Sequence, residues 1–177
     1  MILEMGTTAR HNNILSKIYS DILRKLEDLF YKKQAAAYQE QVALCYEGST
    51  AEPYLVKLID AETTSVSADD LNLFQIIQPD YMLFKHNPYF MNSHGTRIAG
   101  KPDLIVEVWS KDNSESHRNF KKLLYSTSSV TEHWYIEQNS NEVECWFSDK
   151  QLPYQSLNNI LKTQQNIEID LRYLALD

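Results

Sequence analysis

The stretch PDLIVEVWSKD, residues 102–112, constrains the fold more than any other part of this 177-residue sequence. Its apolar residues form a run with the length and composition of a buried strand. Glu107 stands inside this run, between Val106 and Val108. Burying an unpaired carboxylate costs several kcal/mol, so we expect Glu107 at the end of a sheet, beside a cation, a metal ion or water.

The acidic partner of Glu107 is predicted from strand geometry. Side chains alternate across a strand, so Asp103 shares a face with Glu107 but lies roughly 13 Å away at about 3.3 Å per residue. Two oxygens that bind one Mg²⁺ at about 2.1 Å each lie at most about 4.2 Å apart, which makes Asp103 a poor co-ligand. Asp80 belongs to another strand, and Pro79 creates an irregularity that can aim its carboxylate toward Glu107. Asp80 is therefore the predicted partner.

A helix that follows this strand provides the cation. The pattern predicts a second helix over about 114–126, with Ser114 as its cap. Its inward face is expected to contain Phe120, Leu123, Leu124 and Thr127. At about 100° per residue, Lys121 borders this face, whereas Lys122 lies about 200° from Phe120 and is expected to face solvent. We therefore choose Lys121 as the partner of Glu107.

The rest of the pattern predicts a mixed sheet flanked by helices. Apolar residues at spacings of three and four predict a first helix from Thr8 to about Lys32. Turn residues and apolar runs divide the remainder into strands at 37–46, 53–59, 73–84 and 103–109, a loop at 60–70, an irregular connection at 85–101, a hairpin over 132–147 with its turn at 139–141, and a short strand or helical turn over 166–177. We interpret residues 1–177 as a single domain.

Composition and charge exclude several classes of protein. With 43% hydrophobic and 23% charged residues, the chain has the composition of a soluble globular protein. No apolar run approaches the roughly 20 residues of a membrane helix, and the N-terminus lacks a signal region, so we expect a cytoplasmic protein that does not interact with a membrane. The two cysteines, Cys45 and Cys145, have no paired spacing and are expected to be reduced thiols.

The balance of charge limits how this chain can bind nucleic acid. Its 24 acidic and 17 basic residues give a net charge of −7, so any site for a phosphate backbone has to be local. The basic stretches at 24–33 and 117–122 are interpreted as solvated helix faces rather than binding stripes. The larger aromatic residues are interpreted as core and dimer contacts rather than a base-stacking platform: Trp109, Trp134, Tyr135 and Trp146.

Several motifs taken together resemble a known family. The segments QPDYMLF, KPDLIVEVWS, FKKLLYSTSSVTEHWYIE and RHNNIL are similar to motifs of the Uma-type family, bacterial proteins described as restriction endonucleases within the PD-(D/E)XK nuclease superfamily. The likeness runs from about residue 8 to the end, with an insertion around 49–72. It implies an α/β (α+β) restriction-endonuclease-like fold with a central mixed β-sheet flanked by helices.

The resemblance also implies a set of site residues. Asp80 and Glu107 match the Mg²⁺ or Mn²⁺ ligands, with the Val108 carbonyl as a third ligand. Trp109 occupies the position of the lysine in the E-X-K pattern. The lysine that matches instead is Lys121, on the following helix. Such a site hydrolyses DNA phosphodiester bonds, because the metal lowers the pKa of a bound water and lysine orients that water or stabilises negative charge.

Two hypotheses of function remain open. The first is a Mg²⁺-dependent DNA endonuclease that, by analogy, acts as a homodimer on double strands. The alternative is a catalytically degenerate nuclease-fold protein that serves as a binding or regulatory module, motivated by the net charge of −7 and the short segment before the first helix. In that case Asp80 is a turn cap and Glu107 only pairs with Lys121. His11 lies either near the site or in a packing or capping position.

Overall fold

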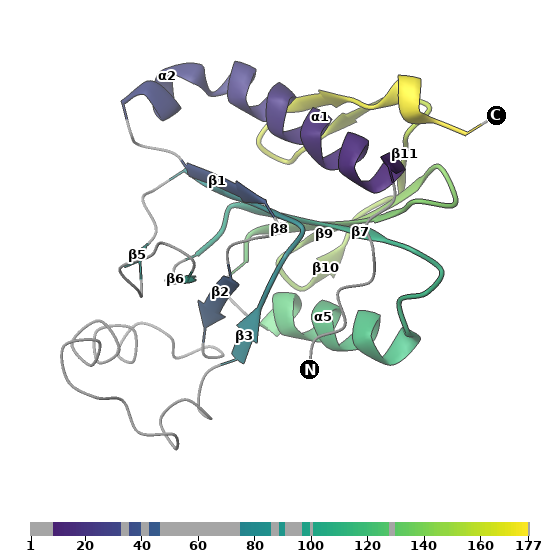
Figure 1. Cartoon of the computed structure of the whole chain (residues 1–177), viewed down its shortest axis with the longest axis horizontal. Helices are drawn as coiled ribbons and strands as arrows, with labels where there is room; N and C mark the ends of the chain where they lie inside the picture. The colour runs from purple at the N-terminus through teal and green to yellow at the C-terminus, as the bar shows by residue number, and fades with distance from the viewer. Residues whose placement is uncertain are drawn as a thin grey trace.

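A mixed sheet of seven strands forms the centre of the structure (Figure 1). The computed structural model describes residues 9–32, 36–39, 43–46, 75–85, 89–90, 97–99, 101–127 and 130–176. The strands of the sheet are β1 (Ala36–Gln39), β4 (Tyr81–Phe84), β7 (Leu104–Trp109), β8 (Glu132–Glu137), β9 (Glu142–Phe147), β10 (Lys150–Gln151) and β11 (Gln155–Ser156). Their order is β1-β4-β7-β8-β9-β10, and β11 pairs with β9.

One parallel pair at the centre makes the sheet mixed. β7 and β8 run parallel, with Glu107 opposite Tyr135, and the helix α5 (Glu115–Thr127) connects them. All other pairs of this sheet are antiparallel. A parallel pair needs such a crossover, and the helix of the crossover packs on one face of the sheet. The predicted mixed sheet flanked by helices is confirmed.

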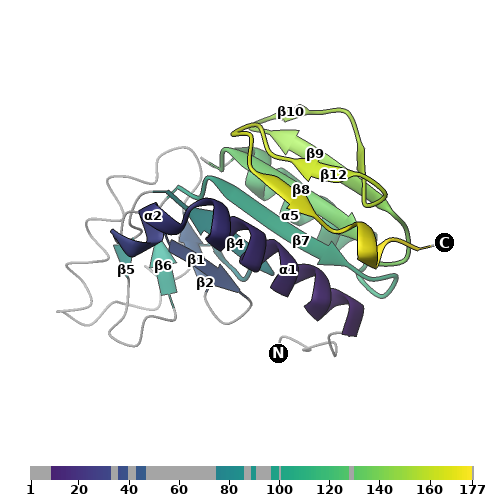
Figure 2. The same cartoon turned by 90° about the horizontal axis from the view of Figure 1, so that it is seen from above.

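The helix α1 (Ala9–Lys25) covers the face of the sheet opposite to α5 (Figure 1). A hairpin of β12 (Ile160–Lys162) and β13 (Glu168–Asp170) lies beside it, as the view from above shows (Figure 2). The apolar side of α1 packs against alternate residues of β7 in one core. Its members include Ile14, Leu15, Ile18, Ile22, Leu104, Val106, Val108, Trp134, Ile136, Leu161 and Ile169.

A second core lies between the sheet and α5. It contains Met82, Phe84, Ile105, Trp109, Tyr125, Val130 and Tyr135. The predicted alternation of β7 is thus confirmed, because Ile105 and Trp109 face α5 while Leu104, Val106 and Val108 face α1. The predicted inward face of α5 is wrong for Leu123, which is 63% exposed. The side chains of the other three predicted members lie outside the described ones.

The first helix is shorter than its apolar pattern predicts. α1 ends at Lys25 and a separate helix, α2 (Glu27–Tyr31), follows after Leu26. Neither Pro nor Gly marks this break, so the sequence pattern did not show it. Leu26 and Phe30 still pack against the core of α1, which is why both obey the predicted period.

A smaller sheet corrects two of the predicted segments. The strand expected at 37–46 is divided into β1 and β2 (Ala43–Tyr46), and the irregular connection at 85–101 contains β5 (Tyr89–Phe90) and β6 (Arg97–Ala99). With β3 (Gln75–Ile77) they form a four-stranded sheet of order β3-β2-β6-β5. The predicted strand at 53–59 and the predicted loop at 60–70 lie outside the described residues.

The end of the chain agrees with the sequence pattern. β8 and β9 form the predicted hairpin, and the last segment contains both predicted alternatives, the strand β13 and a 3₁₀ turn at Arg172–Leu174. Cys145 is a buried free thiol, as expected. None of the described helices is long and apolar enough to span a bilayer.

Candidate active site

Glu107 lies in the interior, 1% exposed, on the face of β7 that α5 covers. Two donors from α5 hold its carboxylate. The ammonium group of Lys121 lies 2.7 Å from Oε2, and the Tyr125 hydroxyl donates to Oε1 at 2.5 Å. The cation that a buried carboxylate requires is therefore present, and it is the predicted one.

The helix start determines which side chains of α5 reach β7. Ser114 precedes the helix, and its Oγ accepts a hydrogen bond from the backbone N–H of His117 at 3.3 Å, which confirms the predicted cap. Lys121 and Tyr125 are four residues apart, so they lie on the same face of α5. Both are buried, with exposed fractions of 8% and 0%.

Asp80 lies at the entry to β4, in the irregular stretch that follows β3. Its Oδ2 accepts a hydrogen bond from the Val108 N–H at 2.7 Å, and His11 Nε2 lies 3.3 Å from the same oxygen. Its Oδ1 makes no hydrogen bond with a described residue. Because Val108 follows Glu107 directly, Asp80 reaches β7 next to Glu107. The predicted irregularity at Pro79 is confirmed, since β3 and β4 are separated there.

Burial and the neighbouring donors shift the pKa of Glu107 in opposite directions. Burial raises the pKa from 4.5 to about 7, and the negative charge of Asp80 raises it as well. The charge of Lys121 and the hydrogen bonds from Lys121 and Tyr125 act in the opposite direction. Burial is the largest of these effects. Positive charge beside the carboxyl would stabilise its ionised form.

The pair of acids fits a magnesium ion better than a metal that needs a complete protein cage. Among the described residues, no three His, Cys, Asp or Glu side chains come together as a metal-binding group. Mg²⁺ is usually held by one or two carboxylates, with waters and substrate phosphates as its other ligands. Asp80 and Glu107 provide that number of carboxylates. The ligand role of the Val108 carbonyl stays a prediction, since only the N–H of Val108 contacts Asp80.

Asp103, which the spacing excludes as a ligand, has another role. Its Oδ2 accepts a hydrogen bond from the Lys85 N–H at 2.7 Å. This bond connects the residue before β7 with the residue after β4, at the end of the strand pair away from Asp80. Asp103 therefore stabilises the pairing of the two strands that carry the site.

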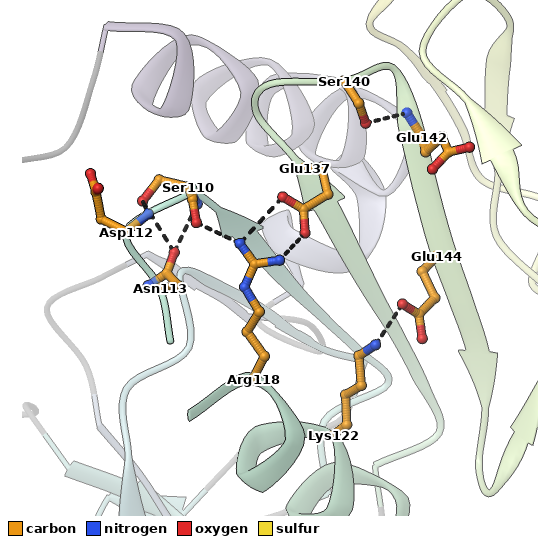
Figure 3. Close-up of polar contacts among 9 residues, drawn as sticks. All are labelled: Ser110, Asp112, Asn113, Arg118, Lys122, Glu137, Ser140, Glu142 and Glu144. Carbon is orange, nitrogen blue, oxygen red and sulfur yellow. Dashed lines mark hydrogen bonds and ion pairs between the residues drawn. The ribbon is translucent and has the colours of Figure 1, made fainter. Parts of the chain in front are cut away.

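The expectation that the basic stretch 117–122 is a solvated helix face is wrong for two other cations of α5 (Figure 3). Arg118 pairs with Glu137 and donates to the Ser110 carbonyl at 2.5 Å. Lys122, expected in solvent, lies 2.6 Å from Glu144 Oε2. The charged ends of Arg118 and Lys122 also lie 5.0 and 5.3 Å from the centre of the Trp109 ring. Both cations therefore fasten α5 to the sheet.

Two buried residues of this region were not found from the sequence. Tyr125 has the pattern of an ordinary core residue, and only its spacing of four from Lys121 could have shown that both reach Glu107. Glu132 starts β8 and is 1% exposed, with hydrogen bonds from the Trp134 indole and the Gln164 N–H. As interpreted from the sequence, Trp109, Trp134 and Tyr135 are buried core residues.

Comparison with known proteins agrees with this architecture. The structure resembles a crystal structure from Anabaena variabilis described as that of a "putative nuclease", with a TM-score of 0.62 and 14% sequence identity over 97% of this chain and 85% of that one. At that identity the likeness shows the fold. No curated protein sequence matches the chain. A family profile described as "Uma2: Putative restriction endonuclease" matches residues 1–176. The chain thus belongs to the Uma2 family, and it has a restriction-endonuclease-like fold.

Proposed function

We propose that this protein is a Mg²⁺-dependent endonuclease that hydrolyses phosphodiester bonds of DNA. The proposal rests mainly on the position of Asp80, whose carboxylate bonds to the residue after Glu107 on the neighbouring strand. The buried ammonium of Lys121 contacts the Glu107 carboxylate. Membership of a family described as restriction endonucleases supports the same reaction class.

Each residue has a defined task in this proposal. Asp80 and Glu107 would hold the ion, which when bound would lower the pKa of a water and neutralise charge on the scissile phosphate. Lys121 donates to Glu107 and lies 3.5 Å from the Gln78 carbonyl, so its ammonium stays at the site and can orient water or stabilise negative charge. The Val108 N–H and His11 hold the Asp80 carboxylate in place.

A non-catalytic binding or regulatory module is the second candidate. It is favoured by the net charge of −7 and by the cations of α5, because Arg118, Lys121 and Lys122 all pair with carboxylates. Cations with carboxylate partners contribute less to binding a phosphate backbone. This candidate predicts no metal-dependent cleavage.

Cleavage assays separate the two candidates. The protein is incubated with supercoiled plasmid, linear duplex or single-stranded DNA, in Mg²⁺, Mn²⁺ or EDTA. We expect metal-dependent cleavage that falls at least about 100-fold in Asp80→Asn, Glu107→Gln and Lys121→Met. Glu142→Gln is the control, because it removes an exposed acid of β9 that lies outside the site. Equal cleavage by wild type, Asp80→Asn and Glu107→Gln would exclude the proposed site, and the absence of cleavage would favour the module.

Double-strand cleavage leads to a further expectation about assembly. One such site cuts one strand, so we propose that two copies act together on a duplex. Sedimentation of the protein with and without a short duplex measures the stoichiometry. A single copy on the duplex that still cuts both strands at once would contradict this proposal.

A further inference from the structure

The Glu107 carboxylate is held by two donors of different kinds, and the neutral donor has no role in the reaction described above. Lys121 binds Oε2 and the Tyr125 hydroxyl binds Oε1. We propose that Tyr125 is a positioning residue, whose hydroxyl fixes the Glu107 carboxylate in the orientation that receives a divalent cation. This inference rests on the proposed function and names a further residue of the same site.

The hydroxyl group, rather than the ring, is the informative part of Tyr125. The ring is fully buried in the apolar core between the sheet and α5, where phenylalanine would fill the same space. A hydroxyl in such a place needs a hydrogen-bond partner, since burying it without one costs free energy. The acceptor that it has is an oxygen of the candidate metal ligand. A requirement for packing alone does not explain the hydroxyl.

The two donors respond differently to a cation. A divalent ion near Glu107 repels the ammonium of Lys121, because both are positive. The Tyr125 hydroxyl carries no charge, and its distance of 2.5 Å to Oε1 is typical of a strong hydrogen bond to an ionised acceptor. Tyr125 is therefore the donor whose contact with Glu107 is not opposed by the charge of a bound cation.

The surrounding structure gives Tyr125 the rigidity that this task requires. Arg118 pairs with Glu137 of β8 and Lys122 pairs with Glu144 of β9, as Figure 3 shows. In the sequence these two cations come before and after Lys121. These contacts fix α5 against the sheet at the turn that precedes Tyr125. A carboxylate that is held by an outer hydrogen bond loses less freedom when it binds an ion.

Titration with Mn²⁺, followed by calorimetry, tests the proposal on the full chain. Losing an outer hydrogen bond to a metal ligand typically weakens metal affinity about 10- to 100-fold, and we expect a loss of this size in Tyr125→Phe. Tyr135→Phe is the matched control, because it removes a buried hydroxyl of the same core that contacts His133 instead of Glu107. Its Mn²⁺ affinity should stay within about twofold of wild type, and Glu107→Gln should lose binding.

The outcomes separate this inference from the function on which it rests. Wild-type protein that binds no Mn²⁺ overturns the metal site and the role of Tyr125 together. Binding that is lost in Glu107→Gln but unchanged in Tyr125→Phe overturns the role of Tyr125 alone. Equal losses in both tyrosine variants would show a general effect on the core, which also overturns the proposal. Thermal unfolding of each variant reports whether it folds.

A measurement on the wild-type protein covers the case in which Tyr125→Phe does not fold. The buried hydroxyl proton of Tyr125 should exchange slowly and give a downfield proton NMR signal. Addition of diamagnetic Mg²⁺ should shift this signal without abolishing it, since the bond to Glu107 persists. A signal that is unchanged at saturating Mg²⁺, or one that disappears, contradicts the proposal.

Discussion

The ammonium group of Lys121 lies 2.7 Å from Oε2 of Glu107, and both residues are buried. A buried ion pair gains little over an apolar pair, but the loss of one partner leaves a charge without compensation. Glu107 also has a pKa of about 7, above its ordinary 4.5, chiefly because of burial. The folded protein therefore holds a proton at Glu107 that the unfolded chain has lost between these two pH values.

Removing Lys121 should destabilise the protein, increasingly so as pH rises. In Lys121→Met the positive charge that lowers the pKa of Glu107 is gone, so the unfolding free energy continues to fall above pH 7. At pH 8 we expect a loss of about 3–5 kcal/mol, in part recovered in the double variant with Glu107→Gln. Urea unfolding at several pH values measures both effects. Strictly additive losses would contradict the coupling of the two residues.

Glu132 should give the protein a second pH dependence. Burial raises its pKa from 4.5 to about 6, so the folded state binds an additional proton between these values. Its contribution to stability is complete below pH 4.5 and is lost as pH rises to 6. Relative to Glu132→Gln, wild type should lose about 2 kcal/mol of unfolding free energy over this window. Chemical unfolding from pH 4 to 7 tests this. Glu142→Gln is the surface control and should show the same pH dependence as wild type. If the unfolding free energies of wild type and Glu132→Gln differed by the same amount at every pH, the prediction would be contradicted.

Arg118 should contribute more to stability than an exposed arginine with a similar pair. It bonds to Glu137 and to the Ser110 carbonyl, and its guanidinium lies over Trp109. Arg118→Met should lower the unfolding free energy by about 1.5–3 kcal/mol, the range for hydrogen bonds that involve a charged group. Arg172→Met is the control, since its pair with Asp170 is exposed and such pairs contribute about 0–1 kcal/mol. Urea midpoints measure both, and equal losses would refute the prediction.

The sequence was most informative where one element decides the position of a side chain. The alternation of β7 predicted which residues face α5, and the helical period of α5 predicted that Lys121 reaches Glu107. Pro79 predicted the break at which Asp80 enters β4. Each of these is a local rule, so neighbouring strands did not have to be known.

Local sequence rules could not predict contacts that depend on neighbouring strands. The sequence pattern places Lys122 in solvent, whereas in the structure it pairs with Glu144 of β9 and lies over the ring of Trp109. The carboxylate of buried Glu132 accepts a hydrogen bond from the N–H of Gln164, which is 32 residues further along the chain. The metal role of Asp80 and Glu107 stays a prediction.

The crossover from β7 through α5 to β8 gives the site an unusual sensitivity to chain length. Glu107, Lys121 and Tyr125 all belong to this one continuous unit, and only Asp80 enters from another strand. A single residue inserted in α5 ahead of Lys121 would turn both donors by about 100° around the helix axis. The number of residues from the start of α5 to Tyr125 is therefore fixed by the contacts that both donors make with Glu107.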